Sequence, residues 1–303
     1  MAGRRSLMIT KDKMRLDLKW ATLQRLKFIE IMSWYAGVVT RSDLAKAFGM
    51  SDPAATKDIK LYNDLAPGNL GYSQAVFGFV PTERFSPVFA NLEPTVVLPV
   101  FSANLATMGG PYGDTLIYGL ATQSLPLPIR LPDRHVLAQI TRAMRGQKKL
   151  KVSYRSLSGR ESQSQRILEP HTLVNTGNRW HVRAYSQETY DFRDFVLSRF
   201  VEAECLNEAA ESNVQFDDDW VETLPLKLGP HRSLDQQKRE SLLLDYGAVD
   251  GVIEIEVRRA LLGYVLQRLN VDTTMDGTMN PDAYPLMLLN RDEIEPFAAW
   301  VFA

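Results

Sequence analysis

Apolar residues near the start of the chain recur every three or four positions, which is the period of a helix with one buried face. Between residues 16 and 35 they are Leu16, Trp20, Leu23, Leu26, Ile29 and Met32. Thr40 followed by Asp43 is typical of a capping box, so a short second helix is expected to end near Gly49. A third helix is predicted to begin after Asp52, the expected N-cap. Three helices with such short connections indicate a helix-turn-helix.

Aromatic and polar residues alternate between positions 71 and 85, with a break near Gly78. This pattern predicts a β-hairpin of the kind that forms the wing of a winged helix-turn-helix. Hydroxyl, amide and lysine side chains on the third helix are of the types that contact phosphates and base edges in a major groove. The predicted DNA contacts are Arg41, Lys57 and Lys60 to phosphates, Ser51, Thr56 and Asn63 to base edges, and Tyr72 from the wing. A small helical subdomain that packs on the rest of the chain would explain the helices equally well, but not the wing.

Residues 91–131 contain five prolines, no lysine and little periodicity, which predicts a connector with short elements of its own. A helix is expected from Pro132 to Gly146, after which the chain changes to the period of strands. Five short strands are predicted between residues 148 and 200, with breaks at turn residues that include Pro170. Because so small a sheet protects its edges best when it closes, we expect a five-stranded barrel of the Sm or SH3 kind.

The last hundred residues turn acidic and then show a strand, a helix, a second strand and a second helix between positions 252 and 302. This order predicts a C-terminal α+β module. Its apolar residues Leu262, Tyr264 and Leu266 are expected to be exposed, which fits a dimerisation or packing role. The expected fold class is multidomain α+β, with a winged helix-turn-helix at 1–90, the connector at 91–131, the barrel domain at 132–206 and the C-terminal extension at 207–303.

The composition is that of an ordinary globular protein of 303 residues, with 45% hydrophobic and 23% charged residues. The single cysteine, Cys205, excludes an intramolecular disulfide and a cysteine-cluster zinc site, and the four histidines form no pair with metal-binding spacing. No metal, cofactor or catalytic residue is predicted. The chain shows no apolar run of membrane-spanning length and no signal peptide, so a cytoplasmic protein that contacts no membrane is expected.

The net charge of −1 conceals a strong segregation of charge along the chain. Residues 1–66 carry 12 basic and 7 acidic side chains, and residues 141–200 carry 12 basic and 5 acidic ones. Residues 201–303, in contrast, carry 8 basic and 20 acidic side chains. Two basic modules favour polyanionic partners, although a single run of charge is more commonly a solvated surface.

The second basic module ends in a predicted hairpin, residues 178–200, that combines four arginines with six aromatic residues. Strand alternation predicts a ligand face with Arg179, His181, Arg183 and Tyr185 from the first strand and Arg193, Phe195, Leu197 and Arg199 from the second, and a core face with Trp180, Val182 and Ala184. Guanidinium groups brought together across strands repel each other unless an anion lies between them, and arginine suits a bidentate grip of phosphate. Alternatively, these arginines pair with Glu188, Asp191, Asp194 or Glu169, or cover apolar strands with their stems.

The run from Val152 to Phe200 resembles a WYL domain. The similarity lies in the tyrosine of VSYRS, the arginine and Pro-His of RILEPH, the strand around Trp180 and the closing segment FRDFVLSRF. With a winged helix-turn-helix before it and an extension after it, the chain resembles the transcriptional repressors of the BrxR and CapW type that accompany bacterial anti-phage defence systems. The resemblance covers nearly the whole chain and is most specific between residues 150 and 200.

The resemblance implies an Sm-like barrel, a homodimer that binds an inverted repeat in double-stranded DNA, and a WYL pocket that senses a nucleotide or nucleic-acid ligand. The ligand-binding residues that it implies are Tyr154, Ser156, Arg166, His171, Trp180, His181, Arg183, Arg193, Phe195 and Arg199. The Trp-Tyr-Leu that names the family is Trp180-His181-Val182 here, so the identity of the ligand is not transferred. An imidazole with an ordinary pKa of about 6.5 in place of the phenol predicts anion binding that depends on pH.

The predicted function is therefore that of a homodimeric, sequence-specific DNA-binding regulator, a repressor of a phage-defence operon that is controlled by an anionic effector at the WYL domain. A transcription activator, or an RNA-binding defence effector that acts through the barrel alone, is the alternative. A less favoured hypothesis is a phosphodiesterase or nuclease with His171 or His181 as general acid or base. The sequence shows no carboxylate cluster for metals, no nucleophile elbow and no phosphate-binding loop that would support this last hypothesis.

Overall fold

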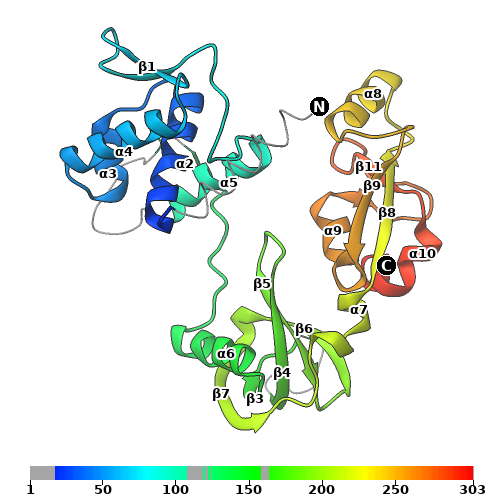
Figure 1. Ribbon diagram of the computed structural model, residues 1–303. Coiled ribbons are helices and arrows are strands. Elements are labelled where there is room, and N and C mark those ends of the chain that lie inside the picture. Colours follow the sequence, from blue (N-terminus) through cyan, green and yellow to red (C-terminus); the bar gives the residue numbers. More distant parts are fainter. Residues whose placement is uncertain are drawn as a thin grey trace, which may run out of the picture. The chain divides into compact units, whose positions relative to one another are not determined.

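The computed structural model describes residues 18–107, 118, 120, 122, 123, 125–157 and 164–302. The chain divides into two compact units, Met1–Pro126 and Leu127–Ala303, and each is described by itself (Figure 1). Both units combine helices with β-sheet, as the predicted α+β class requires. None of the helices in these described ranges has the length and apolar character needed to cross a membrane.

The first unit consists of helices and a two-stranded hairpin. Its elements are α2 (Trp20–Tyr35), α3 (Arg41–Phe48), α4 (Asp52–Leu65), β1 (Leu70–Ser73), β2 (Gly78–Pro81) and α5 (Pro94–Thr107). The predicted winged helix-turn-helix order is confirmed, and so is the capping box of α3: the N–H of Thr40 donates to Asp43 Oδ2 at 2.8 Å, and the N–H of Asp43 donates to Thr40 Oγ1 at 3.2 Å. The predicted N-cap of α4 is wrong, because Asp52 is already helical and Ser51, with φ −77° and ψ 152°, precedes it.

The segment predicted as a connector contains α5, a helix of 14 residues that periodicity did not reveal. Apolar residues occupy most of α5, so no single hydrophobic stripe marks it as a helix. Val97 and Phe101 are buried and pack in one cluster with Ile31 of α2. These contacts make α5 part of the first unit.

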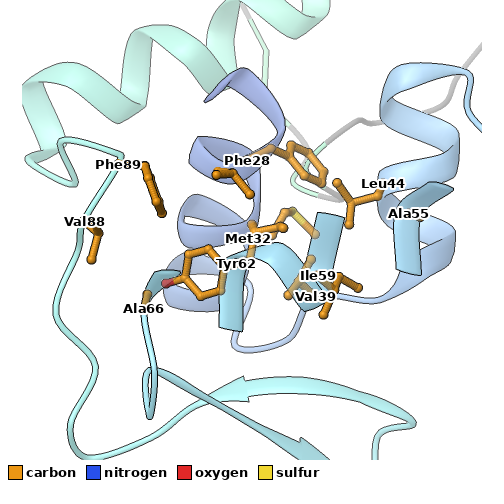
Figure 2. Packing of buried hydrophobic residues seen from close by; sticks show 12 residues of the cluster. Phe28, Met32, Val39, Leu44, Ala55, Ile59, Tyr62, Ala66, Val88 and Phe89 are labelled. Atoms are coloured by element: carbon orange, nitrogen blue, oxygen red, sulfur yellow. The ribbon is translucent and has the colours of Figure 1, made fainter. Parts of the chain in front are cut away.

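The core of the first unit lies where α2, α3 and α4 meet (Figure 2). Phe28 of α2 and Leu44 of α3 are buried there. From α4, Ala55, Ile59 and Tyr62 point into this core, at spacings of four and three residues. One side of α4 is thereby committed to the core, which leaves the opposite side to solvent.

Glu30 of α2 is a buried carboxylate that ties the chain after the hairpin to the helices. It is fully buried, and its two oxygens accept hydrogen bonds from the backbone N–H groups of Val88, Phe89 and Ala90 at 2.7, 2.8 and 2.6 Å. The hydroxyl of Tyr62 donates to the same carboxylate at 3.2 Å. Burial raises the pKa of Glu30, and these hydrogen bonds lower it only in part. The Glu30 side chain thus accepts hydrogen bonds from three backbone N–H groups in the segment that follows the wing.

The wing is joined to the helix-turn-helix by a β-bridge between Val39 and Phe79, whose N–H and C=O groups exchange two hydrogen bonds of 2.9 Å. Gly78 permits this close approach. A Cβ at this position would clash with Cγ2 of Val38 and would lie 3.3 Å from the carbonyl oxygen of Val39. The glycine that appeared in the sequence as a break in alternation therefore determines how near the wing lies to the start of α3.

The second unit begins with a helix and a five-stranded antiparallel sheet. Its first elements are α6 (Arg134–Gly146), β3 (Lys148–Tyr154), β4 (Ser164–Asn175), β5 (Trp180–Ser186), β6 (Asp191–Val196), the 3₁₀ turn η1 (Leu197–Arg199) and β7 (Phe200–Ala209). The strand order is β6-β5-β4-β3-β7. No pairing joins β6 to β7 among the described strands, so the predicted closed barrel is not confirmed.

Two of the five predicted strands are in fact one. β4 continues through Pro170, where the prediction ended a strand, because a register shift between Pro170 and Thr172 forms a bulge that accommodates a residue without an N–H group. The fifth strand is instead β7, which was interpreted as an acidic stretch. Its acidic residues Glu202 and Glu204 point to solvent, and Ala203 and Cys205, which alternate with them, pack against the core.

The rest of the second unit forms a four-stranded sheet with helices. Its elements are η2 (Val214–Phe216), α7 (Asp218–Val221), β8 (Thr223–Pro230), α8 (Gln236–Asp245), β9 (Ile253–Arg258), η3 (Arg259–Leu261), α9 (Leu262–Arg268), β10 (Val271–Asp272), β11 (Leu286–Leu288), α10 (Arg291–Ala298) and η4 (Ala299–Val301). The strand order is β10-β11-β8-β9, and the four predicted elements are β9, α9, β11 and α10. The inner strand β8 was not predicted. Its Pro225 is tolerated because β11 pairs only with Leu228–Pro230.

The prediction that Leu262 and Leu266 are exposed is wrong. Both are fully buried in the core between α9 and the four-stranded sheet. Their spacing of four residues places them on the same side of α9, and Tyr264 lies on another side. The hydroxyl of Tyr264 donates to Asp194 Oδ2 of β6 at 3.0 Å, so α9 contacts both sheets of the second unit.

Candidate nucleic-acid interface and ligand site

The solvent side of α4 carries the polar residues predicted to contact DNA. Ser51, Thr56, Lys57 and Lys60 are exposed, and Asn63 is half-buried. The hydroxyl of Thr56 donates to the carbonyl of Asp52 at 2.9 Å, which holds that side chain in one orientation. Asp52 and Asp64, near the two ends of α4, are also exposed, so the cationic surface is confined to the middle of the helix.

A shallow hollow gathers residues from α3, α4 and the wing. It is lined by Arg41, Thr56, Ile59, Lys60, Asn63 and Phe79. The structure therefore brings together four of the seven predicted DNA contacts, and no acidic residue of the described chain lines the hollow with them. The two cations are suited to contacts with phosphates, and the hydroxyl and the amide beside them are suited to contacts with base edges.

The wing adds two aromatic rings at the edge of this hollow. Tyr72 is 52% exposed, and its ring meets that of Phe79 edge to face at a centroid distance of 5.3 Å. Phe79 was not predicted as a site residue, because only its bridge to Val39 brings it next to α4. The strand pattern by itself contains no signal for that contact.

An ion pair holds α4 against α2. Arg25 Nε donates to Asp58 Oδ2 at 2.6 Å, and Arg25 Nη2 donates to Oδ1 at 3.2 Å. Asp58 is buried, so this pair neutralises an acidic residue in the middle of the helix proposed to face DNA. Sequence reasoning missed both residues, which lie 33 positions apart.

Ion pairs occupy the centre of the predicted ligand site. Arg183 of β5 is buried and forms a bidentate ion pair with Asp217, with Nε 2.7 Å from Oδ2 and Nη2 2.9 Å from Oδ1. His171 Nε2 lies 3.0 Å from the same Oδ2. Burial alone would raise the pKa of Asp217, but the hydrogen bonds from Arg183 and His171 lower it to about 2. Asp217, 34 positions from Arg183, was missed by sequence reasoning.

A second carboxylate approaches Arg183 from β6. Arg183 Nη1 lies 3.6 Å from Asp194 Oδ1, and the other oxygen of Asp194 accepts the hydrogen bond from Tyr264. Burial raises the pKa of Asp194, an effect that Arg183 and Tyr264 oppose. The ring of Tyr264 also lies 5.0 Å from the ring of His181. Through these contacts the five-stranded sheet is attached to α9.

The buried imidazole of His181 makes the stability of this attachment depend on pH. Burial, together with the charges of Arg179, Arg199 and Arg130, lowers the pKa of His181 to about 4 from its ordinary 6.5. Below about pH 6.5, His181 takes up a proton in the unfolded chain, whereas in the folded chain it stays neutral down to about pH 4. The free energy of unfolding should therefore fall as the pH falls through this window. We expect urea unfolding of the full chain to show about 2 kcal/mol less stability from this residue at pH 5 than at pH 7.

Two substitutions test this pH dependence. His181→Phe keeps a ring against Tyr264 and should remove the loss of stability between pH 7 and pH 5. His135→Phe, at an exposed histidine of α6, is the matched control and should leave the loss unchanged. If His181→Phe loses as much stability at pH 5 as the wild type, another group is responsible.

The predicted face with four arginines is wrong, because the register of β5 and β6 is not the one expected. Arg183 lies opposite Asp194, and Ala184 lies opposite Arg193. Directly opposite residues of an antiparallel ladder share a face, so Arg183 and Arg193 project to opposite faces of the sheet. Phe195, predicted on the ligand face, is 3% exposed and lies in the core.

Two of the four hairpin arginines, Arg183 and Arg193, instead form the ion pairs of the alternative expectation, whereas Arg179 and Arg199 pair with no acidic side chain of the described residues. Besides the pair of Arg183 with Asp194, Arg166 Nε lies 3.2 Å from Glu188 Oε2. Arg193 Nε lies 3.9 Å from Asp191 Oδ2, at a largely exposed position. Acidic side chains of the chain itself thus neutralise part of the predicted site.

The other predicted ligand residues lie apart from this cluster, although Arg166 and Phe195 both contact the ring of Tyr154. Tyr154 is buried in the core, where its hydroxyl accepts a hydrogen bond from the N–H of Val196 at 3.0 Å. Trp180, which strand alternation had placed on the core face, is 38% exposed. Ser156 follows β3, and Arg199 ends the turn η1. The structure therefore gathers only His171 and Arg183 around Asp217, with His181 on the adjoining side of Tyr264.

Neither histidine of the hydrolase hypothesis is arranged for acid–base catalysis. Both ring nitrogens of His171 are engaged, Nδ1 with Thr172 Oγ1 at 2.8 Å and Nε2 with Asp217 at 3.0 Å. His181 is 1% exposed. Over the residues that the structure describes, no cluster of three or more histidine, cysteine or acidic side chains is arranged to hold a metal ion. This geometry lends the hydrolase hypothesis no support.

Three family models match successive segments of the chain. They are described as the BrxR transcriptional regulator winged helix-turn-helix domain at residues 21–103, the WYL domain at 135–205, and the BrxR transcriptional regulator C-terminal dimerization domain at 223–294.

Curated relatives align with the chain over nearly its whole length. A DNA-binding transcriptional repressor CapW from Escherichia coli strain KTE188 is 34% identical over 283 residues, which are 93% of this chain and 94% of that one. Proteins of the same name from Pseudomonas aeruginosa and Stenotrophomonas maltophilia are 33% and 32% identical, over 94% and 92% of this chain and equal shares of their own lengths. The similarity therefore spans both compact units.

Proposed function

Because this chain belongs to the family of DNA-binding transcriptional repressors that includes CapW, we propose that it represses transcription as a homodimer bound to an inverted repeat in double-stranded DNA. The observation that carries the proposal is the cationic hollow between α3, α4 and the wing. A two-fold symmetric dimer presents two such surfaces, and an inverted repeat presents two matching half-sites. The C-terminal domain at 223–294 would hold the protomers together.

The proposed contacts follow from the position of each side chain. Arg41, Lys57 and Lys60 would bind phosphates, Ser51, Thr56 and Asn63 would face base edges, and Tyr72 would contact the backbone from the wing, with Phe79 beside it. We propose domain limits of 132–206 and 207–303 for the WYL domain and the extension, and we extend the winged helix from the expected limits of 1–90 to include α5, which packs against α2 and leaves a shorter connector. Such a repressor would act in the cytoplasm, on an operon that we propose to encode a phage-defence system.

The test is binding of the full-length protein to a duplex that carries the inverted repeat upstream of its own gene. Compared with a scrambled duplex of equal length, this operator should bind about a thousandfold more tightly at physiological salt, and the affinity should fall steeply as salt is added. A promoter–reporter fusion should be less active when the protein is present. Equal affinity for both duplexes would refute the repressor function, and higher reporter activity would favour an activator.

Lys60→Ala should weaken binding to the operator and to the scrambled duplex by similar factors, about tenfold for a dimer with two copies of the change. A lysine that contacts phosphate contributes affinity without sequence preference, and its loss should also make the salt dependence less steep. Mobility shifts at several salt concentrations measure both effects. Lys151→Ala, an exposed lysine of β3, is the control and should bind like the wild type. If Lys60→Ala does so too, the cationic hollow is not the DNA surface.

We propose in addition that an anionic effector at the WYL domain controls DNA binding. The cluster around Arg183 supports this, because it joins the five-stranded sheet to α7 through Asp217 and to α9 through Asp194 and Tyr264. An effector acts only if it binds the DNA-competent and the incompetent states with different affinity. Titration of nucleotides and short oligonucleotides into the complex with operator tests the idea, and an operator affinity that none of them changes would refute it.

A further inference from the structure

We propose that the turn between β4 and β5, together with α9, forms a binding site for a phosphorylated ligand whose phosphate is held by Arg130, Arg179 and Arg268. These arginines line a hollow of the second unit whose wall also includes Asn178, Tyr264 and Gln267. None of the ten residues implied by the WYL resemblance lines it. The site therefore differs from the cluster around Arg183, although Tyr264 links the two.

The three guanidinium groups come from three separate segments of the chain and lack an acidic partner among the described residues. Some arginines of the same unit, Arg183 and Arg291 among them, form ion pairs, and others do not. No carboxylate of the described residues pairs with Arg130, Arg179 or Arg268, and no acidic residue is part of the wall. Cations that converge on a concave surface concentrate anions there, and arginine adds the donor geometry that matches phosphate.

The turn that presents Arg179 is held in place by hydrogen bonds. The N–H and the hydroxyl of Thr176 both donate to the carbonyl of Arg179, at 3.1 and 3.0 Å, and the N–H of Gly177 donates to Asn175 Oδ1 at 2.9 Å. Gly177 has a φ of +84°, and a Cβ added to it would lie 3.0 Å from Cζ of Arg268. The guanidinium of Arg268 thus lies close to the backbone of the turn that presents Arg179.

The size of the hollow indicates which part of a ligand it takes. Its volume is about 240 Å³, below the range of about 300–1,000 Å³ in sites that enclose a drug-sized ligand, so it suits a phosphate group. A second hollow of about 340 Å³ shares Thr176, Tyr264 and Arg268 with the first. Its further walls are mostly aliphatic, from Val174, Ile255, Leu261, Val265 and Leu269.

A phosphate joined to a flat ring system, whose faces can pack on apolar side chains, is the chemistry of a nucleoside monophosphate. The phosphate would lie among the arginines and the base in the aliphatic hollow, where Tyr264 offers an aromatic ring to both parts. A free phosphate would use the first hollow alone. The adjoining aliphatic walls are the reason to favour a nucleotide.

A ligand in this site would act on the contact between the five-stranded sheet and α9. The ring of Tyr264 forms part of the wall, while its hydroxyl binds Asp194 and its ring packs against His181. A bound phosphate would offset the positive charge of Arg179, which together with burial keeps His181 neutral. This regulatory consequence rests on the proposed function, whereas binding itself does not.

Calorimetric titration of the full-length protein, without DNA, tests the site with adenosine monophosphate, inorganic phosphate and adenosine. We expect adenosine monophosphate to bind more tightly than phosphate, and adenosine to bind most weakly. The double variant R179Q/R268Q should bind adenosine monophosphate about a hundredfold more weakly, about tenfold for each guanidinium group removed. Arg142→Gln, at an exposed arginine of α6 outside the hollow, should bind like the wild type.

A further variant separates the two hollows. Leu269→Ala should weaken binding of adenosine monophosphate and leave that of phosphate unchanged; unchanged binding of both would overturn the assignment to a nucleotide. The site itself would be overturned if neither phosphate nor adenosine monophosphate binds, or if R179Q/R268Q binds them like the wild type. If adenosine monophosphate binds as expected but leaves operator affinity unchanged, the site stands and effector control through it is refuted.

Discussion

Glu30→Ala is expected to lower the free energy of unfolding of the first unit by about 3–5 kcal/mol, which is a large share of the stability of a small domain. The change would leave the N–H groups of Val88, Phe89 and Ala90, and the hydroxyl of Tyr62, buried without their acceptor. In thermal unfolding of the full chain, the transition of this unit should shift down by about 10 °C or more. Operator binding should weaken in parallel, because α4 and the wing depend on the same core.

Two variants sharpen this test. Glu83→Ala removes an exposed glutamate after β2 and should shift the transition by no more than about 2 °C. Glu30→Gln keeps one acceptor oxygen but turns an amide N–H₂ toward some of the same donors, so its midpoint should lie between those of the wild type and Glu30→Ala. A Glu30→Ala protein that unfolds at the wild-type temperature would show that this carboxylate does not hold the segment.

Asp217→Ala is expected to destabilise the second unit by about 3–5 kcal/mol. Arg183 would keep a buried guanidinium with Asp194 at 3.6 Å as its nearest carboxylate, and His171 would be deprived of its partner as well. Urea unfolding measures the loss of stability, and hydrogen exchange should become faster in β5 and α7, which the pair holds together. In the wild type this contribution is present above about pH 4 and should decline as the pH falls toward 2, because the folded pKa of Asp217 is about 2 and its ordinary value is 3.8.

Asp218→Ala is the matched control, since Asp218 is the adjacent residue and is exposed. It removes the same charge from the same turn without touching Arg183, so the stability of the second unit should change by less than about 0.5 kcal/mol. If both variants are equally stable, the buried pair is not what attaches α7 to the sheet.

The first unit was largely predictable because its signals are local. Helix periodicity and the Thr40–Asp43 box depend on residues three or four positions apart, and both are present in the structure. Four of the predicted DNA contacts also meet in one hollow, because the register of α4 follows from its buried side. The local pattern did not reveal α5, because apolar residues occupy most of this helix and mark no single hydrophobic side.

The ligand site was less predictable because it depends on pairing between distant segments. Alternation correctly placed Val182 and Ala184 in the core, yet it could not determine the register against β6. A shift by one residue moves a side chain to the other face of a sheet, and this is why Arg193 does not join Arg183. The partner that Arg183 does have, Asp217, comes from a stretch that appeared only as part of an acidic run.

The sequence by itself determined the order of the modules, the winged helix and the residue types on the solvent side of its third helix, because periodicity, end caps and charge segregation are properties of neighbouring residues. Only the tertiary structure decided that Glu30 holds the chain after the wing, that Gly78 sets the position of the wing, and that acidic side chains neutralise Arg183 and Arg193 of the expected arginine face. It also decided that three arginines from separate segments converge beside Tyr264. Buried hydrogen bonds, ion pairs and close backbone contacts join residues far apart in the chain, and only folding brings these together.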